Sequence, residues 1–136
     1  MAAPNIVNVT SIIGITTMGP LTATSTRLLI NNSGSNTVLR VNSIQIANTN
    51  GVSNVDVSIG INDSAAGTGT TSYLAKTVTI PADSSLVISG KDTPFYLEEN
   101  RSITGVANAS DADFVISYEV ISWFFVKHKG RYSNGI

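Results

Sequence analysis

The sequence predicts an all-β fold, a single antiparallel β-sandwich of about eight strands whose topology is jelly-roll-like or immunoglobulin-like. Apolar and polar residues alternate along most of the chain, the period of two that places every second side chain on one face of a sheet. Clusters of Asn, Gly, Ser, Asp and Pro interrupt the alternation roughly every ten residues, a spacing typical of sandwiches and barrels. No window combines a helical period with a capping residue. The alternation leaves the choice between the two topologies open.

The first two strands are expected within the first 31 residues. Residues 5–17 are rich in β-branched side chains and favour an extended segment with a bend at Gly14. The Met-Gly-Pro sequence at 18–20 predicts a break. Residues 22–31 resume the alternation, and a run of Asn, Ser and Gly at 31–36 predicts a turn.

The next two strands carry the clearest signals. Residues 37–47 change the phase of their alternation by one between Val41 and Ile44, which a β-bulge near Asn42 would absorb. The turn at 48–51 contains Asn-Gly, the strongest short hairpin signal. Residues 54–62 alternate without interruption, so one side of this strand must be buried.

The remaining strands follow a loop of small residues at 63–71. Residues 72–80 and 85–89 are expected to form two of them. Residues 101–108 and 114–122 then alternate around the polar turn 109–113, which predicts a hairpin. The in-phase apolar residues predict a core made of Leu28, Ile30, Leu39, Val41, Val55, Val57, Ile59, Ile61, Val78, Ile80, Leu86, Ile88, Ile103, Phe114, Ile116 and Tyr118.

Length and composition restrict the classes of function. The 136 residues are the size of one domain, and we expect residues 1–122 to form the β-sandwich. Charged residues make up 12% of the chain, against a usual quarter. Such low charge favours a surface covered by copies of the chain or by a partner, and it is equally compatible with an ordinary, weakly charged β domain.

Charge and hydropathy also suggest which partners to leave aside. A net charge of −1 gives no field that would attract nucleic acid, so no nucleic-acid partner is expected. No apolar run approaches the ~20 residues of a membrane helix, and the start MAAPNIVNV lacks the features of a signal peptide. We therefore expect no membrane association. The sequence contains no cysteine, which excludes disulfides.

Reactive side chains are few. The single histidine, His128, lies between two lysines, without a neighbouring carboxylate for acid–base catalysis or a second metal ligand. The acidic pairs at 98–99 and at 111 and 113 are too small to supply the about six to eight oxygens that a hard cation takes, and they indicate turns. We expect no enzymatic activity, no cofactor and no metal.

The C-terminal residues 123–136 break the pattern. Four large apolar residues in a row, Trp-Phe-Phe-Val, precede a cluster of cations. One interpretation is a last strand buried on both faces and a basic tail. The other is a docking extension whose aromatic side chains enter a neighbour while the cations meet an acidic rim. The predicted docking residues are Trp123, Phe124, Phe125, Lys127, Lys129, Arg131 and Tyr132.

Three stretches of the chain carry a family resemblance. They are Ile-Pro-Ala-Asp-Ser-Ser-Leu-Val-Ile at 80–88, Phe-Tyr-Leu-Glu-Glu-Asn-Arg-Ser-Ile at 95–103 and Val-Ile-Ser-Tyr-Glu-Val-Ile-Ser at 115–122. Together they resemble a family of small virion proteins encoded by tailed phages, especially marine phages such as cyanophages. The likeness extends from about Ile6 to Ser122, whereas residues 123–136 reach beyond the point where such proteins tend to stop.

The resemblance implies a β-sandwich subunit located in a virion. It implies the major capsid protein or another virion protein as partner, and a homo-oligomer, with a trimer favoured. The function that it favours is a capsid decoration (cement) protein bound to the assembled head. The alternatives are a tail, neck or baseplate accessory protein of the same virion, or a carbohydrate-binding adhesin with Tyr73, Tyr96 and Tyr132 as candidate aromatic contacts.

Deletion of residues 123–136 tests the docking extension. The truncated chain is expected to stay folded, because the predicted sandwich ends before the deletion, but no longer to assemble with its neighbour in the virion. Circular dichroism checks the fold, and co-sedimentation with particles checks assembly. Normal assembly of the truncated chain would refute the docking role.

Overall fold

The computed structural model describes residues 11–122, 127–128 and 131–132. These residues form strands and no helix, which confirms the all-β prediction. In the same part of the chain, no helix is long and apolar enough to cross a membrane. The strands are β1 (Ser11–Leu21), β2 (Thr26–Asn31), β3 (Thr37–Asn48), β4 (Val55–Asn62), β5 (Thr71–Ile80), β6 (Ser85–Ser89), β7 (Phe95–Leu97), β8 (Arg101–Ala107), β9 (Ala112–Ser122), β10 (Lys127–His128) and β11 (Arg131–Tyr132).

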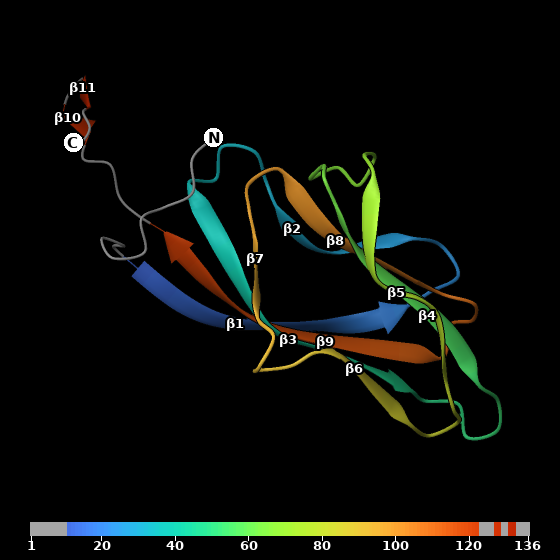
Figure 1. Cartoon of the computed structure of the whole chain (residues 1–136). Helices are drawn as coiled ribbons and strands as arrows, with labels where there is room; N and C mark the ends of the chain where they lie inside the picture. Colours follow the sequence, from blue (N-terminus) through green and yellow to red (C-terminus); the bar gives the residue numbers. More distant parts are fainter. Residues whose placement is uncertain (1–10, 123–126, 129–130, 133–136) are drawn as a thin grey trace.

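Two antiparallel sheets face each other (Figure 1). The five-stranded β1 sheet has the order β1-β9-β3-β6, with β7 also paired to β3. The four-stranded β5 sheet has the order β2-β8-β4-β5. From β1 to β4, consecutive strands alternate between the sheets, and the two strand orders together are those of a jelly roll. The structure therefore decides against the immunoglobulin-like alternative.

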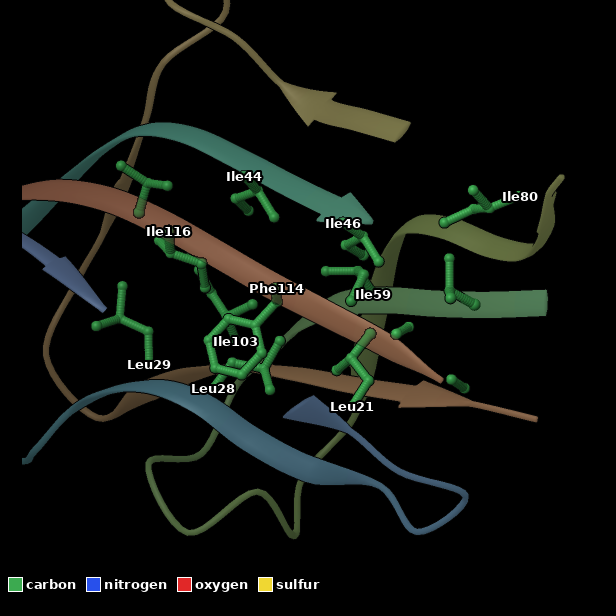
Figure 2. Packing of buried hydrophobic residues seen from close by; sticks show 14 of the residues in the cluster. Leu21, Leu28, Leu29, Ile44, Ile46, Ile59, Ile80, Ile103, Phe114 and Ile116 are labelled. Atoms are coloured by element: carbon green, nitrogen blue, oxygen red, sulfur yellow. The ribbon is translucent and has the colours of Figure 1, made fainter. Parts of the chain in front are cut away.

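The core lies between the two sheets. Figure 2 shows Leu21, Ile44 and Phe114 of the β1 sheet among side chains of the opposite sheet. Most of the predicted core residues are buried. Those that are only partly buried are Ile30, Ile61, Val78, Leu86, Ile88 and Tyr118.

Two β-bulges decide which apolar side chains enter the core. The register of β3 against β9 shifts between Val41 and Ser43, which confirms the bulge predicted near Asn42. A second bulge, which the alternation did not reveal, lies between Arg27 and Leu29 of β2. Because of it, Leu28 and Leu29 are both buried, and Ile30 is left only partly buried.

The predicted hairpins at 48–51 and 101–122 are wrong, although their strands exist. β8 and β9 belong to different sheets, and so do β3 and β4. The β3–β4 and β8–β9 segments are therefore connections that cross between the sheets, and they are hydrogen-bonded to each other. The N–H and the hydroxyl of Thr49 donate to the carbonyl of Asp111, at 2.7 and 2.9 Å. Gly51 also lacks the positive φ that a tight hairpin turn requires.

The predicted break at 18–20 is also wrong, because β1 continues to Leu21. Pro20 has no N–H to donate, but β1 is an edge strand, where such a residue is tolerated. Gly19 lies directly opposite Phe114, where a Cβ would come within 3.3 Å of the aromatic ring. The glycine makes room for a core side chain and does not end the strand.

Three asparagines at strand ends satisfy backbone groups that leave the ladders. They are Asn31 of β2, Asn48 of β3 and Asn62 of β4, and all three are buried. The Asn48 amide donates to the carbonyls of Ser53 and Ile80, both at 2.9 Å, and its oxygen accepts from the Asn50 N–H. The other two asparagines bind the turns that follow them in the same manner.

Substitution Asn48→Ala tests this arrangement. It leaves one buried and one partly buried carbonyl without their donor, so the free energy of unfolding is expected to fall by about 1–3 kcal/mol. Asn32→Ala, at an exposed position one turn earlier, is the matched control and should change it by less than about 0.5 kcal/mol. Urea denaturation measures both, and equal effects would contradict the role of Asn48.

Gly60 of β4 offers a second stability test. A Cβ there would lie 2.8 Å from the Ser72 carbonyl oxygen and 3.2 Å from the Tyr73 Cα, both backbone atoms of β5. Gly60→Ala is expected to destabilise by about 1–3 kcal/mol. Gly14→Ala on β1, where nothing lies within 4 Å of the added Cβ, should be neutral or slightly stabilising. Thermal melts that rank the two variants in the opposite order would overturn this account.

Candidate docking surface

The outer face of the β1 sheet carries an exposed apolar row. Met18 of β1 lies opposite Val115 of β9, Val115 opposite Gln45 of β3, and Gln45 opposite Val87 of β6. Directly paired residues share a face of the sheet, so these four side chains form one line across four strands. Met18 is 71% exposed, Val87 58% and Val115 40%. We refer to Met18, Val115 and Val87 as the apolar row.

The surroundings of the apolar row carry little net charge. On the same face, Arg40 of β3 and Glu119 of β9 lie opposite each other and form an ion pair at 3.7 Å. Their partner on β7 is Tyr96, which is 48% exposed. The charges of the pair largely cancel, which leaves the exposed carboxylate of Asp113, two residues from Val115 on the same face, as the charge nearest the apolar row.

A shallow hollow lies at the β1 end of the apolar row. Its volume is about 280 Å³, and Met18 and Val115 are among its lining residues. The remaining lining residues are Gly19, Pro20, Asp113 and Phe114. A hollow of this kind can receive one apolar side chain of a partner, which is how anchor residues bind at protein interfaces.

The outer face of the β5 sheet is different, because the loop between β4 and β5 covers part of it. Arg27 of β2 donates to the Ala65 carbonyl at 3.0 Å, and Ser102 of β8 donates to the Ser64 carbonyl at 2.8 Å. Ser102 and Thr104 are thereby buried although they belong to the outer side of the sheet. The chain itself covers this part of the β5 face, whereas the apolar row stays open.

The predicted C-terminal docking residues are only partly covered by the structure. Trp123, Phe124, Phe125 and Lys129 lie outside the described residues. The backbone of Lys127 lies in β10, which pairs with β11, the strand that contains Arg131 and Tyr132. The docking role of these residues remains a prediction.

The acidic residues singled out in the sequence bind within the turns. The Asp111 carboxylate accepts from the Asn50 amide at 2.9 Å, and Glu98 pairs with Arg101 at 3.7 Å. Glu99 is buried and accepts from the N–H of Asn36. Among the described residues, no three of the types His, Cys, Asp and Glu come together as a candidate metal site.

Two of the three tyrosines proposed for a carbohydrate site, Tyr73 and Tyr96, do not share a surface. Tyr73 lies on β5 and Tyr96 on β7, in opposite sheets. The Lys76 ammonium lies 4.4 Å from the centre of the Tyr73 ring and covers it. These two aromatic rings therefore do not form one binding platform.

Comparison with known proteins gives a fold likeness. No family model and no curated protein matches the chain. A protein of the disulfide-linked pili that form Bacillus endospore appendages is similar, with a TM-score of 0.51 and 14% identity over 84% of this chain and 88% of that one. A pentameric capsid protein from metagenomic phage sequences is 13% identical over 88% of this chain and 66% of that one, and its TM-score of 0.36 is too low to carry an argument.

The apolar row was missed at the sequence level, although a signal for it exists. Val115 and Val87 lie in strands whose other phase already holds the core residues Phe114, Ile116 and Leu86. A strand with apolar residues in both phases exposes one set unless both faces are covered. The sequence does not indicate which sheet face the chain covers with its own loops.

Proposed function

We propose that this chain is a structural protein of a phage virion, and more specifically a capsid decoration protein that binds the assembled head. The observation that carries the proposal is the exposed apolar row on a face of low net charge. The outer face of the second sheet, in contrast, is partly covered by the chain's own loop. The resemblance of three sequence stretches to small virion proteins supports the virion as the location.

The binding free energy that the apolar row can supply suits a subunit of a repeated lattice. Fully burying one such side chain contributes about 1.5–3 kcal/mol, and these are already partly covered, so the row supplies only a few kcal/mol per copy. Association of two free proteins costs about 4–15 kcal/mol in lost freedom. On a lattice, copies that contact several sites at once pay that cost once, so weak contacts can add up to stable binding. Binding to the assembled shell and not to its free subunits would stabilise the shell.

The fold likeness supports a role as a building block. The pilus protein with a similar fold belongs to an assembled filament, as its disulfide-linked pili indicate. The present chain has no cysteine, so its contacts with neighbours would have to be non-covalent or use other chemistry. An exposed apolar row is one way to provide such contacts.

Serine substitution of the apolar row tests the proposal. The double variant Val87→Ser and Val115→Ser should fold as the native chain does, because both side chains are largely exposed. Its affinity for purified phage heads should fall by about tenfold or more, since the apolar area at the contact is lost. Co-sedimentation of the chain with heads, at a series of chain concentrations, measures the affinity.

Leu74→Ser with Tyr73→Ser on β5 is the matched control, since it removes exposed apolar area from the other sheet and should leave head binding unchanged. A double variant that binds heads normally would refute the role of the apolar row. The tail, neck or baseplate role would be favoured if the chain bound purified tails in place of heads. Its copy number per virion would then be that of a single ring of subunits and not that of a whole shell.

A further inference from the structure

β1 is a long, regular and uncharged sheet edge. Among the described strands it pairs with β9 alone, and its register is continuous from Ser11 to Leu21. None of its eleven residues is charged. Half of the N–H and C=O groups of an edge strand point away from its one neighbour, so such an edge is a template for another strand.

The other edges of the described sheets are shorter or interrupted. β2 has six residues and a bulge, while β6 and β7 have five and three. β5 is longer, but its register against β4 shifts twice, Thr77 has a φ of 51°, and it carries Lys76. Bulges, short strands and lysines are the usual protections of a sheet edge. β1 has none of these three protections, and its one proline, Pro20, lies next to its last residue.

Two isoleucines of β1 point to the inner side of the sandwich and are nevertheless exposed. Ile13 lies opposite Val120 and Ile15 opposite Tyr118, and both partners pack against the core. Ile13 is 54% exposed and Ile15 41%. Apolar side chains on the inner side that stay exposed would gain side-chain neighbours if the sheet continued beyond β1.

We propose that the missing neighbour is β1 of a second copy of this chain, paired antiparallel across a two-fold axis at Ile15. In this register Ile12 lies opposite Met18 of the other copy, Ile13 opposite Thr17, and Ile15 opposite its own equivalent. Ile12 and Met18 are 59% and 71% exposed in the single chain, and the pairing places them against each other.

The chemistry of β1 favours a second copy as the occupant. Two uncharged strands meet without like-charge repulsion, and the exposed apolar residues of one are complementary to those of the other. A two-fold contact also requires a self-complementary surface, which this register supplies. Pro20, which has no N–H, falls outside the paired stretch 11–19. The contact therefore does not require an N–H from Pro20.

A charge-swap experiment on the full chain tests the pairing. Ile15→Lys and Ile15→Glu each place two like charges opposite each other at the axis, so each variant alone should dimerise about tenfold more weakly or worse. An equimolar mixture of the two should recover the dimer, because a lysine then faces a glutamate. Sedimentation equilibrium across the micromolar range measures both. Recovery in the mixture also demonstrates that both variants are folded.

Two controls make the test specific to β1. Ser72→Lys, on the opposite edge strand β5, should leave dimerisation unchanged. Since the chain has no cysteine, Ile15→Cys introduces a single thiol that should form a disulfide-linked dimer on mild oxidation, whereas Ser72→Cys should not.

Several outcomes would overturn the inference. They are a native chain that stays monomeric throughout this range, equal effects of Ile15→Lys and Ser72→Lys, or a mixture without recovery. A native chain that forms a trimer, and whose Ile15→Cys variant forms no disulfide-linked dimer, would also overturn the inference. It would support the trimer that the sequence resemblance favours. None of these results depends on phage heads, so this inference and the proposed function can fail separately.

Discussion

The jelly roll depends on how buried backbone groups are satisfied where the chain crosses between the two sheets. At such a crossing the strand leaves its ladder while it is still buried, and each unpaired N–H or C=O would cost free energy. Asn48 resolves this at the end of β3, since its one side chain binds a carbonyl of the following turn and a carbonyl at the end of β5. Asn31 acts similarly at the crossing from β2 to β3, and Asn62 binds the loop that joins β4 to β5 within one sheet. The asparagine-rich turns are therefore a structural requirement of this connectivity.

The alternation of the sequence was sufficient to predict strands but not their assignment to sheets. A period of two states which side chains face inward, and both sheets of a sandwich share one interior. Residues 101–108 and 114–122 alternate in the same way whether they form a hairpin or cross between sheets. The decision lies in contacts that are distant in sequence, such as the bonds from Thr49 to Asp111. The bulge near Asn42 was predictable, since there the phase change falls between two apolar pairs of the same strand.

The docking surface was less accessible to sequence reasoning than the fold. The docking prediction was made for the aromatic and basic residues at the C-terminus because they break the alternation. Val115 and Val87, in contrast, occupy positions inside alternating strands. An apolar residue in the outward phase becomes a surface feature only if no other element covers it. The covering of the β5 sheet by residues 63–70 depends on the bonds of Arg27 and Ser102 to that loop, which local sequence does not encode.

The two sheets divide the tasks of a building block. The β5 sheet has a partly covered face and an interrupted edge, whereas the β1 sheet has an exposed apolar row and an open edge. An apolar row and an open edge on the same sheet limit the ways in which copies can meet. In the proposed pairing, Met18 of one copy adjoins Ile12 of the other on the outer side. The apolar rows of two copies then lie on one continuous face, so a shell could bind both at once, and each weak contact would raise the effective concentration of the other.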